Sequence, residues 1–353
     1  MTFYIGVDFH PHQQTVAWCD KETGETETRK LAHDIEKVRE FYSTLREPGV
    51  VGVEASTRAA WFENVVLEAG HKLLVGNPVS IRKTALSRHK NDRIDAEHIL
   101  WLLMRDEFPA IWRRPPESNE VLEVLRLRLS LVRQRIQVYN RLQALAHNVG
   151  LPKVSMRTAA VQQVLKRAEM SESGALCRNQ LFSMLSYLNE RIAELEAWLK
   201  PKAATNDRVQ LLMTQKGVGY LTALTFVHTV GDIHRFEKGP RGVTKFAGYD
   251  SVEKSSANKK RFGPIRKAGP SLLRFQLGQA AQSAIRLDAK LKAFYKRLAK
   301  KKPKGVAKTA TARRLLVKLS IMLRDNITAG EFDLRGRTVG NARKIVRPEM
   351  TAA

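Results

Sequence analysis

Four carboxylates in the first hundred residues have the types and positions that metal-dependent phosphoryl chemistry needs. Asp8 and Glu54 each end a short apolar run that is rich in β-branched and aromatic residues. Such runs are typical of short buried strands. Asp92 and Asp95 are three residues apart in a segment with helical character, so they share one face of a helix.

These acids predict a site for divalent cations. If the two strands are neighbours and the helix packs over their ends, the four carboxylates converge and need a counter-charge. Oxygen ligands favour Mg²⁺ or Mn²⁺, and two such ions about 4 Å apart suit phosphoryl transfer. The alternative to a metal site is that the four acids lie on the surface, at strand ends and on a solvated helix face. His10 and His12 follow Asp8 closely and can approach a metal, although surface-loop histidines are commoner.

The charge of the chain is strongly uneven. The 353 residues carry a net charge of +26, with an isoelectric point near 10.3. Residues 1–110 hold 14 Lys and Arg against 17 Asp and Glu, whereas residues 256–320 hold 19 basic residues and one acid, Asp288. A solvated surface normally mixes both signs, so the second region predicts a phosphate-binding surface and a nucleic-acid partner.

Cysteine content and hydropathy narrow the class of protein. Cys19 and Cys177 have no spacing that indicates a disulfide framework or a zinc site. No apolar stretch is long enough for a membrane span, and the first residues lack the pattern of a signal peptide. We therefore expect a soluble protein of the cytoplasm without a membrane partner.

The first domain, residues 1–108, has an α/β pattern. The first three predicted strands are closely spaced and form an antiparallel meander, and the later strands alternate with helices and add in parallel. This order, with acids on the first and fourth strands, is the ribonuclease H-like arrangement. The predicted strands are 3–8, 14–19, 25–31, 50–54 and 72–76, and the predicted helices are 33–47, 58–69 and 91–105.

A proline-containing linker at 107–117 leads to two long helices within residues 117–200. Their apolar residues recur at alternating spacings of four and three, which is typical of a coiled coil. They run from Leu125 to Ala146 and from Leu181 to Leu199. The pair can pack as a hairpin within the chain or between protomers, and the pattern alone leaves this open.

A helical, basic domain follows at 205–330, and a polar, basic tail at 331–353. Gly217-Val-Gly219 has the form of a helix-hairpin-helix turn, whose second helix can direct backbone amides at a phosphate. A tight turn between packed helices needs the same glycines.

Two adjacent serines, Ser255 and Ser256, precede three consecutive basic residues, Lys259, Lys260 and Arg261. A hydroxyl among cations can attack a phosphodiester. Serines in such segments more often cap helices or donate to phosphates without reacting. The basic residues Arg266, Lys267 and Arg274 follow and add to the predicted nucleic-acid surface.

The residues resemble those of the insertion sequence 110 family of DEDD transposases, which is related to the Piv invertases and includes bridge-RNA-guided recombinases. In the first domain the resemblance lies in Ile5-Gly-Val-Asp8, Val53-Glu54-Ala-Ser and Asn91-Asp92-Arg-Ile-Asp95-Ala. In the second it lies in Gly217-Val-Gly219, Phe246-Ala-Gly248, Ser255-Ser256, Arg261-Phe-Gly263, Lys267-Ala-Gly269 and Leu272-Leu-Arg274.

The resemblance implies a RuvC-like first domain whose carboxylates hold Mg²⁺, and a nucleophilic serine in a helical transposase domain. Counting from Phe246-Ala-Gly248 places that serine at Ser256, and counting back from Lys267-Ala-Gly269 places it at Ser255. It further implies donor and target DNA, a structured bridge RNA, a homodimer or tetramer, and a bacterial, nucleoid-associated location. The rival interpretations are a metal-dependent nuclease such as a junction resolvase, and a non-catalytic nucleic-acid-binding protein.

Overall fold

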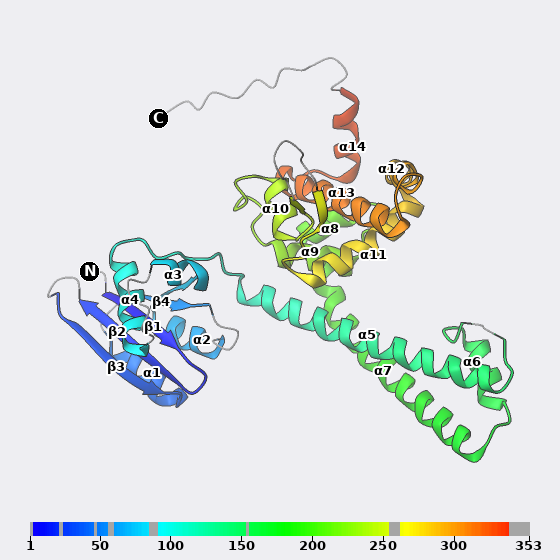
Figure 1. Cartoon of the computed structure of the whole chain (residues 1–353), viewed down its shortest axis with the longest axis horizontal. Coiled ribbons are helices and arrows are strands. Elements are labelled where there is room, and N and C mark those ends of the chain that lie inside the picture. Colours follow the sequence, from blue (N-terminus) through cyan, green and yellow to red (C-terminus); the bar gives the residue numbers. More distant parts are fainter. Residues whose placement is uncertain are drawn as a thin grey trace. The chain divides into compact units, whose positions relative to one another are not determined.

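The computed structural model describes residues 3–20, 24–45, 48–55, 60–84, 91–152, 155–253 and 262–338. The chain folds as two compact units, Met1–Arg113 and Arg114–Ala353 (Figure 1). Each unit has its own apolar core. No helix in these described ranges is long and apolar enough to cross a membrane.

A five-stranded mixed sheet forms the centre of the first unit. Its order is β3-β2-β1-β4-β5. The first three strands pair antiparallel, whereas β4 pairs parallel with β1 and β5 parallel with β4. The predicted meander with parallel additions is thus confirmed. The strands are β1 Phe3–Phe9, β2 Gln13–Asp20, β3 Thr26–Ala32, β4 Gly49–Glu54 and β5 Lys72–Gly76.

Helices cover both faces of this sheet. The side chains of α1 and α2 join Ile5 and Val7 in one apolar cluster, and α4 covers the opposite face, where its Ala96 and Leu100 contact Ala17. The short α3 was not predicted. These helices are α1 Ile35–Thr44, α2 Ala60–Glu68, α3 Pro78–Thr84 and α4 Asp92–Met104.

Two glycines let α4 approach the strands closely. Gly6 of β1 is in register with Gly52 of β4. A Cβ at Gly6 would lie 2.3 Å from the Ala96 carbonyl oxygen, and one at Gly52 would lie 2.8 Å from the Leu103 side chain. Because strand side chains alternate between faces, Asp8, two residues after Gly6, projects toward the same face as α4.

The second unit is mainly helical. One core joins residues of α5, α8, α9, α10, α11 and α13, including Leu125, Phe226 and Leu319. Its helices are α5 Pro116–Asn148, α6 Ala159–Arg167, α7 Glu172–Ala204, α8 Asp207–Met213, α9 Tyr220–Val230, α10 Pro240–Phe246, α11 Ser271–Leu287, α12 Ala289–Ala299, α13 Lys304–Asp325 and α14 Ala329–Thr338. The last of these overlaps the beginning of the expected tail, and residues 339–353 lie outside the described ranges.

The two long helices α5 and α7 pack against each other as a hairpin within the chain (Figure 1). Their distal halves enclose a second apolar cluster that includes Val138, Leu142 and Leu185. The predicted seam of α7 is buried except at Leu195, which is half-buried. That of α5 is partly wrong, because Ile136 is 40% exposed, whereas Val138 and Leu142, which are not in the predicted repeat, are buried. Leu125 and Leu129 instead belong to the large core of the second unit, which α5 shares with α8, α9, α10, α11 and α13.

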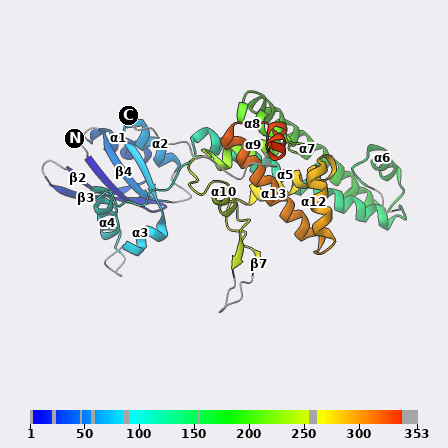
Figure 2. The same cartoon turned by 90° about the horizontal axis from the view of Figure 1, so that it is seen from above.

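A small antiparallel pair of strands, β6 Ser251–Glu253 and β7 Phe262–Ile265, was not predicted. Figure 2 shows β7 extending away from the helices of this unit. An ion pair lies at the base of the pair of strands, where Arg266 Nε is 3.1 Å from Asp250 Oδ2. The connection between the strands, residues 254–261, lies outside the described residues.

Candidate functional site

Asp8 and Asp92 are brought together by β1 and the first turn of α4. Asp8 is near the end of β1, and its side chain is only 13% exposed. Asp92 begins α4 directly after Asn91, whose side chain accepts a hydrogen bond from the Arg93 amide and caps the helix. Acidic residues are favoured in a first helical turn by the helix dipole, so capping and charge both place Asp92 there.

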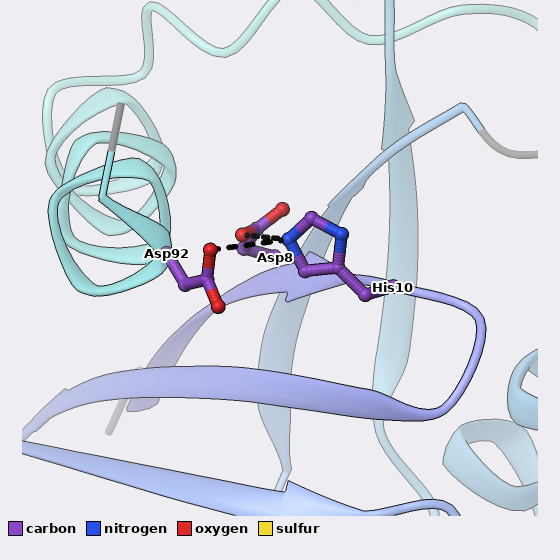
Figure 3. Close-up of side chains that lie close together, drawn as sticks. All are labelled: Asp8, His10 and Asp92. Carbon is purple, nitrogen blue, oxygen red and sulfur yellow. Dashed lines mark hydrogen bonds and ion pairs between the residues drawn. The ribbon is translucent and has the colours of Figure 1, made fainter. Parts of the chain in front are cut away.

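His10 completes a group of three potential metal ligands (Figure 3). Its Nε2 atom lies 2.9 Å from Asp8 Oδ2 and 3.4 Å from Asp92 Oδ1. One ligand atom from each residue lies within 4.8 Å of the other two. This spacing allows one cation to contact all three side chains.

Burial has the largest effect on the ionisation of Asp8. Burial raises the pKa of the Asp8 carboxyl, His10 lowers it, and the charges of Asp95 and Asp92 raise it further, with a net increase. Lys30 Nζ lies 3.6 Å from Asp92 Oδ2 and offsets part of the negative charge. Ionisation of Asp8 is therefore less favourable than in water, and a bound cation would offset this cost.

Glu54 and Asp95 are near the group but not within it. Val53 is in register with Val7, so Glu54 follows at the end of the strand beside Asp8. Its Oε1 atom accepts a hydrogen bond of 3.2 Å from Arg82 Nη2. Asp95 acts on Asp8 through its charge. The structure thus brings Asp8 and Asp92 into contact with His10, and leaves Glu54 bound to an arginine.

The donor set fits a divalent cation. Two carboxylates and an imidazole are common ligands of divalent metals, and hard carboxylate oxygens suit Mg²⁺ and Mn²⁺. Thr15, paired with Asp8 across β1 and β2, has a buried hydroxyl with no hydrogen-bond partner in the described part of the chain. An unsatisfied hydroxyl beside Asp8 fits a hydrated cation, whose water could donate a hydrogen bond to it. Asp8, Asp92 and His10 would hold the ion.

Two motifs on either side of the predicted serines pack against each other. A Cβ at Gly248 would lie 2.1 Å from the Ala268 carbonyl oxygen, and one at Gly269 would lie 2.2 Å from the Phe246 carbonyl oxygen. Both glycines have positive φ angles, of 71° and 117°. Phe246-Ala-Gly248 and Lys267-Ala-Gly269 thus form one backbone junction, from which β6 and β7 extend.

The serines and basic residues predicted between residues 255 and 274 fall into two groups, those outside the described residues and those whose contacts the structure gives. Ser255, Ser256, Lys259, Lys260 and Arg261 lie outside the described residues. Arg266 pairs with Asp250, and Arg274 Nη1 donates a hydrogen bond of 3.1 Å to the Ala247 carbonyl oxygen. Lys267 is exposed, with a φ of 57°.

The Gly217-Val-Gly219 turn connects α8 and α9. Gly217 has a φ of 89°, and a Cβ there would lie 2.4 Å from the Ala284 amide nitrogen of α11. Gly219 is the N-cap of α9, with open space around its Cα. Close packing explains Gly217, whereas Gly219 leaves the first amides of α9 without a side-chain cap.

Arg82 was not predicted to lie near the acids, whereas His10 was predicted as a residue that can approach a metal. His10 follows Asp8 by two residues, and this spacing places both on one side of an extended chain. That signal was available in the sequence. Arg82 lies on the unpredicted helix α3, and no sequence pattern connects it with Glu54.

Comparison with protein families identifies the class. Residues 5–149 match a DEDD transposase family, and residues 209–296 match the transposase family IS116/IS110/IS902. Together the two matches cover most of the α/β unit, the helix α5 and part of the basic helical unit. The chain belongs to the IS110 family.

Named relatives agree with this assignment. The chain is 28% identical to a probable family 20 transposase of Pseudomonas aeruginosa, over 72% of this chain and 76% of the relative. It is 30% identical to the transposase for insertion sequence element IS1111A of Coxiella burnetii, over 58% and 57%. It is 27% identical to the transposase for IS1328 of Yersinia enterocolitica, over 79% and 82%.

Proposed function

We propose that this protein is a DNA recombinase of an insertion sequence, which cuts and rejoins DNA through a serine nucleophile assisted by divalent cations. In this proposal the first unit is a RuvC-like, ribonuclease H-like domain, and the second carries Ser256, or Ser255 in the alternative register. The observation that carries the proposal is the convergence of Asp8 and Asp92, from a strand and a helix, inside the DEDD family domain.

The carboxylates position the reacting phosphate. Asp8 and Asp92 would hold Mg²⁺ or Mn²⁺, which when bound polarises a phosphoryl oxygen and neutralises charge that develops there. Glu54 would exchange its hydrogen bond with Arg82 for the cation, and Asp95 would supply further negative charge. The buried position of Asp8 limits the water around the ion and fixes the direction of its carboxylate.

The serine forms the covalent bond. Its hydroxyl loses a proton, Oγ bonds to phosphorus, the P–O bond to the departing strand end breaks, and the departing oxygen takes up a proton. One phosphate ester replaces another, so rejoining by the reverse reaction needs no ATP. The junction of Phe246-Ala-Gly248 with Lys267-Ala-Gly269 supports this assignment, because it holds both ends of the segment that contains the serine.

Nucleic acids are the proposed partners. Transposases act on DNA, and the basic second unit has the charge to bind it. A structured bridge RNA that pairs with donor and target DNA, and a dimer or tetramer of the chain, belong to the proposal through the family resemblance. Both are testable by identifying co-purified RNA and by measuring the mass of the particle in solution.

A suicide DNA substrate tests the serine. We expect a covalent adduct with the wild-type protein, which peptide mapping locates at Ser256 or Ser255. Replacing that serine with alanine should abolish the adduct and leave DNA binding intact, while the same change at the neighbouring serine serves as the control. Undiminished strand exchange in the Ser255→Ala, Ser256→Ala double variant would defeat the nucleophile assignment.

The metal-dependent nuclease is the second candidate, since the acids alone are compatible with water as the nucleophile. It predicts cleaved DNA without a covalent adduct, in a reaction that both serine variants retain. The recombinase predicts a covalent protein–DNA adduct and the nuclease does not, and one denaturing gel distinguishes the two.

A further inference from the structure

A cavity of about 580 Å³ in the second unit is lined by positive charge. Three arginines, Arg114, Arg126 and Arg133, line it together with the first residues of α11, and none of the described lining residues is acidic. The other lining residues are Leu122, Leu129, Thr229, Phe246, Gly269, Pro270, Ser271 and Leu272.

The three arginines have no counter-charge in the described part of the chain. Arg126 and Arg133 are exposed, and neither makes an ion pair there. Arg114 is half-buried, and its Nε is buried without a hydrogen-bond partner. Burial, and then the charge of Arg126, lower the pKa of the Arg114 guanidinium. Three neighbouring cations around one cavity favour an anion between them.

The beginning of α11 adds backbone donors to the same cavity. This 17-residue helix begins at Ser271, and Pro270 provides no side-chain cap for it. The first amides of a helix have no intrahelical partner and carry partial positive charge. Gly269, with its φ of 117°, brings the start of the helix against Phe246. Amides and guanidinium groups thus face one space.

We propose that this cavity binds a backbone phosphodiester of nucleic acid. Guanidinium groups match the paired oxygens of a phosphate, and helix amides favour the same anion. Such a contact positions the nucleic acid without reading its sequence. The inference rests on the proposed function, in that the chain is taken to bind nucleic acid. It assigns the contact to residues other than the predicted Arg266 and Arg274, which hold partners within the protein.

A carboxylate placed in the cavity tests the anion site without weakening the helix. Ser271→Glu puts a negative charge in the first turn of α11, where the helix dipole favours it, so folding stability should not fall. Ser173→Glu in the first turn of α7 is the matched control. We expect Ser271→Glu to weaken binding of duplex DNA or hairpin RNA by about tenfold, and Ser173→Glu to leave it close to wild type.

Removal of the charges gives an independent measurement. The double variant Arg126→Gln, Arg133→Gln is compared with Arg141→Gln, Arg157→Gln, two exposed arginines of the same unit outside the cavity. Fluorescence anisotropy over a salt series should show the slope of log K against log salt falling by about 0.9 for the one phosphate lost, in the cavity variant alone. The arm that changes, DNA or RNA, identifies the source of the phosphate.

Equal losses in the cavity and control variants, or binding unchanged in both cavity variants, would overturn the phosphate site while leaving the recombinase proposal intact. Wild-type protein that binds neither nucleic acid would overturn both. Circular dichroism of each variant ensures that the comparison is made between folded proteins.

Discussion

Gly6 of β1 and Ala96 of α4 lie in backbone contact: a Cβ at Gly6 would come within 2.3 Å of the Ala96 carbonyl oxygen. Because Asp92 precedes Ala96 by one turn of α4, and Asp8 follows Gly6 by two positions of β1, this contact sets the separation between the two acids. The geometry of the metal ligands is thus determined by main-chain packing as well as by side chains.

Gly6→Ala should disturb the site through this contact. The added methyl group has no room, so we expect a loss of unfolding free energy of about 2 kcal/mol and weaker binding of Mn²⁺. Gly278→Ala is the control, since a Cβ there meets no atom within 4 Å and alanine stabilises a helix interior by about 0.5–1 kcal/mol. Isothermal titration with Mn²⁺ and urea unfolding measure the two effects. Full metal affinity in Gly6→Ala would show that α4 can shift without moving Asp92.

Asp8→Asn should have opposite effects with and without metal. The folded-state pKa of Asp8 is raised, so its contribution to stability is present below the unfolded pKa and lost as pH rises through the folded pKa. Without metal at neutral pH, we therefore expect Asp8→Asn to be as stable as wild type or more stable.

Added metal should make wild type more stable than Asp8→Asn. Wild type should gain about 2.7 kcal/mol at a metal concentration of 100 Kd, whereas the variant should gain much less. Thermal unfolding in chelator and in excess Mg²⁺ or Mn²⁺ measures both arms. A variant that gains as much from metal as wild type would remove Asp8 from the ligand set.

Arg82→Gln should strengthen metal binding. Arg82 competes with a cation for Glu54, and an exposed ion pair of this kind contributes about 0.5–1 kcal/mol. We expect a two- to fivefold gain in Mn²⁺ affinity, about what that free energy implies. The same change in a Glu54→Gln background should have no effect if Glu54 carries the difference. If Arg82→Gln still raises the Mn²⁺ affinity in the Glu54→Gln background, the gain comes from removing a positive charge near the site and not from releasing Glu54.

Asp288→Ala should destabilise the helical unit. Asp288 is 8% exposed and caps α12, accepting hydrogen bonds from the Lys290 and Leu291 amides and from Gln215. Burial alone would raise the pKa of Asp288. These hydrogen bonds and the charge of Lys318 together lower the pKa by more than burial raises it, so the pKa of Asp288 is below its ordinary value.

The stabilisation by Asp288 is therefore present above its unfolded pKa of about 3.8 and is lost as pH falls through the lower folded pKa. We expect a loss of about 2 kcal/mol at neutral pH, which shrinks only below about pH 4. Asp34→Ala, at the exposed cap of α1, should cost less. Urea unfolding across this pH range measures both, and an equal cost for the two caps would contradict the role of burial.

The first unit was predictable because its signals are local. Short apolar strands separated by helices set the meander and the parallel strands, and the order of acids along the chain placed Asp8 and Asp92 at one end of the sheet, although Glu54 and Asp95 lie outside the group that these two form with His10. Gly6 and Gly52 did not reveal that α4 would touch the backbone, since a glycine in a strand has several explanations. The pairing of Glu54 with Arg82 depends on helix α3, which carries no strong sequence signal.

The second unit was harder to predict because its long helices pack on two sides. The apolar repeat of α5 from Leu125 to Ala146 was interpreted as one seam, yet Leu125 belongs to the large core of the second unit and Ala146 to the distal cluster between α5 and α7. A heptad pattern does not say which neighbour a helix has at each turn. Arg114, Arg126 and Arg133 likewise fall outside the most basic segment, and only the packing around α11 gathers them.

α5 is one uninterrupted helix of 33 residues, about 50 Å long. Its first turns are fixed in the large core of the second unit, and its last turns form the distal cluster with α7 and α6. The same helix therefore joins the turns that carry Arg126 and Arg133 to the distal cluster without a break in its hydrogen-bonded backbone. A displacement of the distal half of α5 would reach the basic cavity through one continuous element rather than through a loop.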